Sequence, residues 1–476
     1  MTNENVLRRF AVLFPVFAFL LAWCPVSSVA QAPAKLIVRN AYIFSMAADQ
    51  KTPFRGYLVI GEDGRIVTVA AGEPPASLKA ATVWNAEGRW VMPGFISAHS
   101  HLWQSAYRGL ASDQTLLGWI DALYGKAVKQ ASAEDLYWFT LEGGLDHLRH
   151  GITATYSFNY GGHSRDQSEA FNENTFRGEA ESGVRFVHGW EPGKSGPAYT
   201  TEIADRELGS FLAWTEKQPR TKLLSVMING GTSFDGTPQQ AVLEAALMKH
   251  YHVSNQSHYL EQPETQVADR EQFKWFTDAG LLTDKMIFGH FIHTDAGILA
   301  ATGQAHAAMS WNPLSNGRLA SGVADIPQYL KAGVRVGMGV DGEASADLAD
   351  PFENLRTGLY AIRDKYENAG VMSPYDVLRL HTRGSADVLG VADKLGSLET
   401  GKMADFLVID PSRFGHVFDP YATLVFVTSQ ADLERVYLGG ELMVERGIPL
   451  KQNMMKVQRE VDRRVALHDK GVGAAN

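Results

Sequence analysis

The chain has 476 residues, a length that suits one large domain with a smaller one beside it. Its 45% hydrophobic and 20% charged residues are the composition of an ordinary globular protein and exclude a disordered or fibrous chain. The formal net charge of −9 gives no electrostatic reason to expect nucleic acid as a partner, and an anionic substrate would need a local basic pocket.

The first thirty residues have the order of features that is typical of a secretory signal peptide. Arg8 and Arg9 precede an apolar run that ends at Trp23, and Ser28-Val29-Ala30 offers small residues for cleavage. The apolar run covers about 14 residues, whereas a helix that spans a membrane needs about 20. We therefore expect a signal peptide at 1–30, a periplasmic or secreted protein, and no stable membrane insertion after cleavage.

The one cysteine of the sequence, Cys24, lies inside the expected signal peptide. The mature protein would then have no disulfide, no thiolate metal ligand and no cysteine nucleophile. A metal would have to be held by His, Asp and Glu.

Short strands with turn signals between them are predicted at 36–38, 57–60 and 66–69, and a similar pattern returns at 405–410 and 433–438. We interpret the two regions as one small β-sandwich domain formed from both chain ends. Its N-terminal part would be residues 31–92 and its C-terminal part residues 395–450. Residues 451–476 are expected to form a C-terminal helix or tail.

Between these regions apolar strands alternate with helical stretches such as Ala133–His150 and Pro238–Tyr251, the pattern of parallel βα units. Eight such units in about 250 to 300 residues predict an α/β fold, a (β/α)8 TIM barrel over 93–394, with a doubly wound open sheet as the alternative. The strands are predicted near 91–101, 153–159, 184–190, 222–229, 253–261, 286–291, 305–312 and 334–341.

The residues that suggest chemistry fall at the ends of predicted strands, where barrel enzymes place their active sites. The first strand ends in His99-Ser100-His101, and alternate side chains of a strand share a face, so both rings can point into the barrel mouth. His258 ends the fifth strand, His290 the sixth and Asp341 the eighth. Imidazoles and a carboxylate from four strand ends predict a site for a first-row metal.

Glu261 is a further candidate at the end of the fifth strand. It stands three residues after His258, so a straight strand would aim the two side chains in opposite directions. Both can face a metal if the strand curls at Tyr259–Glu261.

Four motifs accompany these strand ends. They are Val91-Met92-Pro93-Gly94-Phe95 before the two histidines, Arg149-His150-Gly151-Ile152-Thr153, Asn312-Pro313-Leu314-Ser315-Asn316, and Gly396-Ser397-Leu398-Glu399-Thr400-Gly401-Lys402-Met403-Ala404-Asp405. Together, over about residues 35 to 450, they resemble the amidohydrolase superfamily. The similar branch holds metal-dependent nucleobase and nucleoside deaminases, including cytosine deaminases, and triazine chlorohydrolases.

The resemblance implies that His99, His101, His258 and Asp341 hold one divalent metal ion, with zinc expected and iron or manganese as alternatives. It implies that Glu261 and His290 move protons and orient the reacting water, and that Asp341 accepts a proton from that water. Superfamily members with two metals commonly carry a carboxylated lysine at the end of the fourth strand. Here Lys222 opens that strand and its end has no lysine, which favours a mononuclear site.

Two departures from the branch bear on the substrate. The stretch 228–234 lacks the histidine and proline that many of these deaminases carry after the fourth strand, and Trp311 stands where relatives often have a histidine. Trp311 and Asn312, together with Trp103 and Trp119 from the long loop after the first strand, are candidates for substrate contact. Trp103 and Trp119 could equally anchor their loop, and Asn312 could hold the backbone of its turn.

The predicted function is therefore hydrolysis of a non-peptide carbon–nitrogen bond in a small cyclic or aromatic molecule, with deamination of an N-heterocycle preferred. Hydrolysis of an amide, urea or carbamate and hydrolytic dechlorination stay open as alternatives. A non-catalytic binding protein is the least favoured, because such descendants usually lose metal ligands. The expected partner is a small-molecule substrate, and the sequence leaves a homo-oligomer open.

Overall fold

The structure is a computed structural model of the chain, and it describes residues 34–162, 164–193, 199–219, 222–233 and 236–468. The predicted signal peptide at 1–30 lies outside the described residues. Within them, no helix combines the length and the apolar character that crossing a membrane requires.

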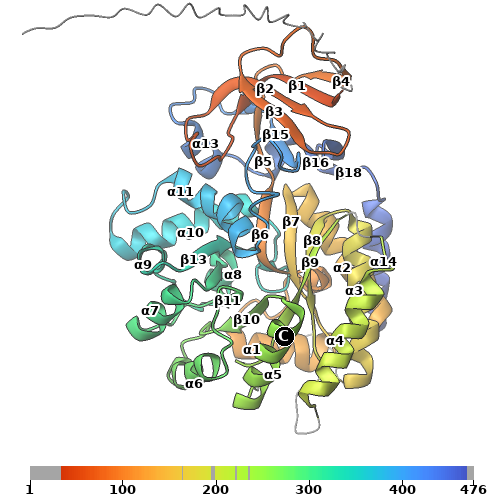
Figure 1. Ribbon diagram of the computed structural model, residues 1–476, viewed down its shortest axis with the longest axis vertical. Coiled ribbons are helices and arrows are strands. Elements are labelled where there is room, and N and C mark those ends of the chain that lie inside the picture. The colour runs from red at the N-terminus through yellow and green to blue at the C-terminus, as the bar shows by residue number, and fades with distance from the viewer. Residues whose placement is uncertain (1–33, 163, 194–198, 220–221, 234–235, 469–476) are drawn as a thin grey trace, which may run out of the picture.

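A mixed sheet is built from both ends of the chain, and Figure 1 shows it above the barrel with red N-terminal and blue C-terminal strands together. The two ends meet where β15 pairs antiparallel with β5, whose other neighbour is β1. The strands are β1 (Ala34–Ile43), β2 (Phe54–Ile60), β3 (Ile66–Ala71), β4 (Ala80–Asn85), β5 (Trp90–Pro93), β15 (Phe406–Ile409), β16 (Leu433–Leu438), β17 (Glu441–Glu445) and β18 (Ile448–Pro449).

The second sheet is parallel and runs in chain order, with a helix between most neighbouring strands. Its strands are β6 (Phe95–His101), β7 (Ile152–Phe158), β8 (Arg185–Trp190), β9 (Leu223–Gly230), β10 (Asn255–Tyr259), β11 (Met286–His290), β12 (Ala308–Trp311), β13 (Arg335–Met338) and β14 (Asp341–Gly342). β13 pairs with β12, and its continuation β14 pairs with β6, so the last strand returns to the first. The fold is thus the predicted (β/α)8 barrel.

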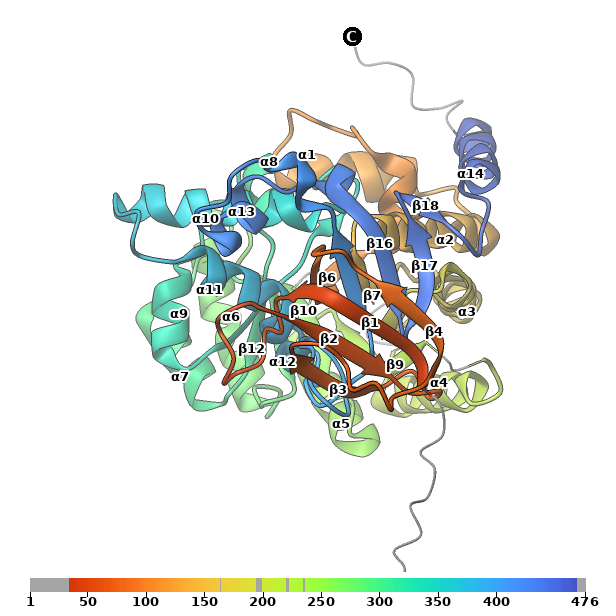
Figure 2. The same cartoon turned by 90° about the horizontal axis from the view of Figure 1, so that it is seen from above.

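Helices surround this sheet, as the view from above in Figure 2 shows for α2, α3, α7 and α9. The longer ones are α2 (Ala133–Arg149), α3 (Arg165–Ser182), α4 (Thr201–Thr215), α5 (Pro238–Tyr251), α6 (Gln266–Asp278), α7 (Ala296–Gln304), α10 (Pro351–Tyr366) and α14 (Met454–His468). The shorter ones include α8 (Pro313–Arg318), α9 (Ile326–Ala332), α11 (Pro374–Arg379), α12 (Ser385–Val388) and α13 (Pro420–Phe426).

Local sequence explains where two of these helices begin. Ser132 and Asp135 form a capping box that starts α2, and Thr237 caps α5, with Pro238 at the first helical position. Both devices satisfy backbone N–H groups that a helix start leaves without partners, and proline there loses no hydrogen bond.

The segment after the first barrel strand differs from the predicted long loop, because much of it is helical. It contains η1 (Leu102–Tyr107), α1 (Leu116–Ile120) and η2 (Asp121–Ala127). Trp103, Trp119 and Leu123 of this segment are buried in one apolar cluster with α2 and α14. That packing gives the segment an apolar core of its own, although its many polar residues are typical of a loop.

Candidate metal centre

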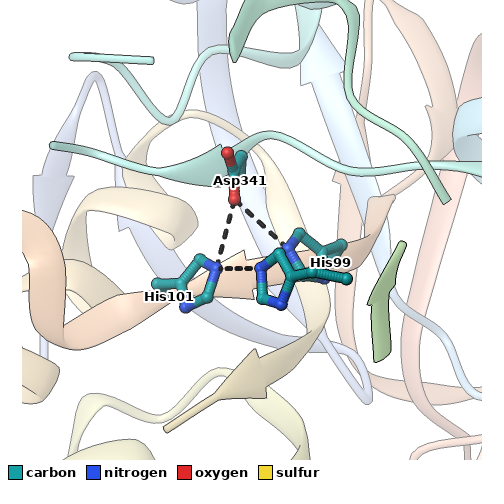
Figure 3. Close-up of side chains that lie close together, drawn as sticks. His99, His101 and Asp341 are labelled. Atoms are coloured by element: carbon teal, nitrogen blue, oxygen red, sulfur yellow. Dashed lines mark hydrogen bonds and ion pairs between the residues drawn. The ribbon is translucent and has the colours of Figure 1, made fainter. Parts of the chain in front are cut away.

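Four side chains from distant parts of the chain converge at the carboxyl ends of the barrel strands. One ligand atom each of His99, His101, His258 and Asp341 lies within 4.8 Å of the others. The two histidines of β6 share a face because they are two residues apart, as predicted. Figure 3 shows His99 and His101 below Asp341, with the aspartate pointing between the two rings.

The two carboxylate oxygens of Asp341 have different neighbours. Oδ1 lies 3.2 Å from Nε2 of His99 and 3.3 Å from Nε2 of His101. Oδ2 accepts hydrogen bonds from the hydroxyls of Ser315 (2.5 Å) and Ser345 (2.8 Å). Burial alone would raise the pKa of Asp341, but the two histidines hold it well below its usual value. The aspartate is therefore an anion that is fixed on both sides.

Hydrogen bonds orient the first two rings. Nδ1 of His99 donates to the side-chain oxygen of Gln256, whose amide in turn donates to the backbone oxygen of Ala98 at 2.9 Å. Nδ1 of His101 donates to the backbone oxygen of Phe158 at 3.0 Å. With the proton on Nδ1, each ring presents the lone pair of Nε2, which is the arrangement of metal-ligating histidines.

The donor set fits a divalent cation. Nε2 of His99 is buried and has no hydrogen-bond partner, which is costly for a polar atom unless something else binds it. Burial lowers the pKa of His99 to about 4 and that of His258 well below its usual value, so both rings are neutral at pH 7. Neutral imidazoles with one carboxylate are the ligands that zinc accepts in proteins.

The turn predicted after His258 is present. β10 ends at Tyr259, and Leu260 adopts a left-handed backbone with φ of 51°. After this turn Glu261 is buried and lines the same cavity as His258. A bulky residue rarely adopts such a conformation, and residues held this way cluster at active sites.

His290 is placed by a hydrogen bond to the helix that follows β12. Its Nδ1 donates to Oδ1 of Asn316 at 2.7 Å and lies 3.6 Å from Oε1 of Glu261. Its Nε2 faces Oδ2 of Asp341 at 3.9 Å. Burial alone would lower the pKa of His290, but the carboxylates of Glu261 and Asp341 raise it. Burial also raises the pKa of Glu261 to about 7.

A cavity of about 1170 Å³ opens onto these residues. Five side chains of the site line it, namely His101, His258, Glu261, His290 and Asp341. The wall also carries the aromatic residues Trp119, Tyr124, Phe158, Tyr160 and Tyr199. Such a volume exceeds the roughly 300–1,000 Å³ that is typical of small-molecule pockets, so there is room for more than a single ring.

Of the four predicted substrate contacts, one lies at the cavity. Trp119 lines it and donates from Nε1 to the backbone oxygen of Ala344 at 2.7 Å. Trp103, Trp311 and Asn312 are each 1% exposed or less and are not among its lining residues, which corrects those predictions.

The reason differs among these three residues. Trp103 packs against Tyr107, Tyr124 and Tyr160, so it supports the aromatic wall from behind. Trp311 points outward to α10, where its ring lies against Gly358. The side-chain oxygen of Asn312 accepts from Oγ of Ser310 at 2.8 Å, and its amide nitrogen lies 3.4 Å from Nε2 of His290. Asn312 therefore contacts His290 and does not line the cavity.

Several residues of the site were not predicted. Gln256, Ser315, Ser345 and Asn316 hold His99, Asp341 and His290, and Glu191 lines the cavity directly after β8. Glu191 follows the predicted strand 184–190, so the same search of strand ends could have found it. Gln256, Ser315 and Asn316 act through contacts between segments far apart in the chain, for which a single sequence carries no signal, whereas Ser345 lies four residues after Asp341.

Comparison with known proteins decides the family. The family model described as "Amidohydrolase family" matches residues 90–443. The chain belongs to the amidohydrolase family. A 5-methylthioadenosine/S-adenosylhomocysteine deaminase of Desulforudis audaxviator (strain MP104C) is 26% identical over 438 residues, which cover 90% of this chain and 98% of that protein.

Solved structures show the same fold. An adenosine deaminase from Xanthomonas campestris with bound zinc superposes with a TM-score of 0.79 at 19% identity, covering 92% of this chain and 99% of that one. The zinc complex of atrazine chlorohydrolase from Arthrobacter aurescens TC1 gives 0.78 at 21% identity, covering 90% and 100%. These likenesses confirm the TIM barrel fold of this member of the amidohydrolase family.

Proposed function

We propose that this amidohydrolase is an exported enzyme that uses a single divalent metal ion, zinc, to deaminate an N-heterocycle carrying a substituent. The observation that carries the proposal is the convergence of three imidazoles and Asp341 beside a Glu261–His290 pair. The deaminases and the zinc complexes among its relatives support both the reaction and the metal.

The charge of each residue in the site determines its role in the reaction. A divalent ion held by the four side chains supplies Lewis acidity, which lowers the pKa of water from about 15.7 to about 7. Asp341 accepts the proton of the attacking water, and Glu261 delivers a proton to the departing amine. His290, directed by Asn316, donates to the ring atom on which negative charge develops. A carbon–oxygen bond forms, the carbon–nitrogen bond breaks and ammonia leaves.

A mononuclear site is favoured by the end of β9. This strand ends at Asn229-Gly230, and no described residue there is a lysine that could bridge two ions. Among the described residues, the four side chains named above are the one group of His, Asp and Glu with the geometry of a metal site.

The cavity wall favours a substrate without negative charge. Its described residues include no lysine or arginine, whereas Glu191, Glu202, Glu261 and Asp341 all contribute carboxyl groups. Away from the metal residues, an anion at this wall would meet carboxyl groups and no described lysine or arginine.

Ammonia release tests the reaction. The zinc-loaded protein should release ammonia from an amino-substituted heterocycle in a panel of nucleobases, nucleosides and aminotriazines. Release of a larger amine from amides, ureas or carbamates without any ammonia would replace deamination by that alternative. Chloride release from chlorotriazines alone would indicate dechlorination instead.

Export rests on the basic, apolar and small-residue order of residues 1–30, and cleavage after Ala30 would leave every described element intact. Expression of the full chain in a bacterium with a periplasm should give a product that begins near Gln31. An intact N-terminus in the cytoplasmic fraction would contradict export.

A further inference from the structure

Glu191 is a carboxyl group in the cavity that the proposed reaction does not use. It directly follows β8, the third barrel strand, whereas the metal residues lie on β6, β10 and β14. Trp190 pairs with Ile228 of β9, and Asn229 of β9 pairs with Gln256 of β10. Two strand spacings of about 4.8 Å therefore separate Glu191 from the strand of His258, about 10 Å in all.

The backbone of Glu191 is fixed by α3. Its N–H donates to the side-chain oxygen of Asn172 at 2.9 Å. Its C=O accepts from Oγ of Ser168 and from the amide of Asn172, both at 2.9 Å. Gly161 makes room for the side chain, because a Cβ there would lie 2.6 Å from Cγ of Glu191. The carboxyl group is thus held in place before any substrate arrives.

Asn229 orients the carboxyl group. Its amide nitrogen donates to Oε2 of Glu191 at 2.9 Å and to the backbone oxygen of Asn159 at 3.1 Å. Its own oxygen accepts from the hydroxyl of Tyr156 at 2.5 Å. With every polar atom of the Asn229 side chain engaged, the amide has one fixed orientation. A pair tied down this way is typical of preorganised binding groups.

The carboxyl group keeps unused hydrogen-bonding capacity toward the cavity. Among the described residues Asn229 is its one hydrogen-bonding side chain, and no described lysine, arginine or histidine forms an ion pair with it. A carboxyl group has about four sites for hydrogen bonds, so Oε1 and part of Oε2 are left for a ligand.

Hydroxyl groups are the ligand chemistry that suits this carboxyl best. Burial raises the pKa of Glu191 to about 8, with the hydrogen bond from Asn229 opposing the shift, so both charge states are populated near neutral pH. A hydroxyl can donate to the ionised form and accept from the protonated form. A cation would suit the ionised form alone, and an anion would find no described lysine or arginine on the wall.

We infer that Glu191, oriented by Asn229, binds the hydroxyl groups of a sugar attached to the heterocycle, and that it thereby selects nucleosides over compounds without those hydroxyls. This inference rests on the proposed function in placing the heterocycle at the metal. A ring at the metal with a sugar attached spans the separation between His258 and Glu191.

Binding of two deaminated nucleosides tests the inference without turnover. We would measure the affinity of the zinc-loaded protein for inosine and for 2′,3′-dideoxyinosine by calorimetry. The parent should bind inosine roughly tenfold more tightly or better, the effect of one or two hydrogen bonds in a buried site. Glu191→Met, which is similar in size and apolar, should weaken inosine binding by the same factor and leave the dideoxy compound unaffected.

Two variants control for structural damage. Glu191→Gln keeps both hydrogen bonding and shape and should retain most of the preference for inosine. Glu216→Gln makes the same chemical change at an exposed carboxyl at the end of α4, outside the cavity, and should match the parent. Zinc content and circular dichroism of each variant report whether the fold is intact.

The outcomes separate the two proposals. If Glu191→Met still prefers inosine, or if the parent binds both compounds equally or binds neither, the role of Glu191 is wrong. Ammonia release without a preference for the hydroxyls would leave the deaminase proposal standing alone. If the parent releases no ammonia from any heterocycle but Glu191→Met loses the preference for inosine, the hydroxyl site is supported and the deaminase proposal is wrong.

Discussion

Oε1 of Glu261 lies 3.6 Å from Nδ1 of His290, although the two residues follow different barrel strands. The left-handed turn at Leu260 brings the carboxyl group to the site, and Asn316 holds the imidazole. Each group shifts the proton affinity of the other, since the imidazole favours the ionised carboxylate and the carboxylate favours the charged ring. The pair can therefore hold and release a proton near neutral pH beside the metal residues.

Glu261→Gln should retain the metal and lose most of the activity. The amide cannot carry a proton to the departing amine, and general acid–base catalysis contributes roughly 10²-fold or more. Steady-state kinetics with elemental analysis of the same sample checks both parts. Turnover at the parent rate would remove Glu261 from the mechanism.

Asn316→Ala should lower kcat roughly tenfold and leave KM and metal content nearly unchanged, because it removes the acceptor that aims His290 and touches neither metal nor cavity. Asn316→Asp keeps an oxygen acceptor and should recover much of kcat. An Asn316→Ala variant that loses metal instead would show that the residue maintains the fold of the site and does not orient His290.

The stability of the protein should report the protonation of Glu191. Its pKa rises from an ordinary 4.5 to about 8 in the folded chain, so the folded state binds this proton more tightly than the unfolded chain does. The stabilisation is fully present below 4.5 and is lost as the pH rises through about 8. Glu191→Gln removes this dependence, so its melting temperature should rise relative to that of the parent from about pH 4.5 to about pH 8. Parallel melting curves would contradict the shift.

The barrel and the convergence of the four candidate metal ligands could be predicted because their signals are local. Alternating apolar strands and helical stretches indicate the fold, and His99-Ser100-His101 needs no more than the two-residue period of a strand. The curl at Leu260 could be anticipated from the three-residue spacing of His258 and Glu261, and the structure has it.

The cavity wall could not be predicted in the same way. Trp103 and Trp311 lie near strand ends that border the site. Whether their rings line the cavity depends on the packing of distant elements such as α10. Of the two hydroxyl partners of Asp341, Ser345 is local, whereas Ser315 comes from the segment after β12, whose approach no local pattern encodes. Glu191 directly follows the predicted strand 184–190 and therefore lies within the strand-end rule.

Metal content tests the central claim most directly. The purified protein should contain about one zinc ion per chain, whereas His99→Ala, which removes one of the four ligands, should contain far less and show no turnover. His250→Ala, the same change at an exposed histidine outside the site, is the matched control and should keep its zinc. A His99→Ala protein that binds zinc as fully as the parent, or a parent that is active after complete removal of divalent metal, would contradict the account.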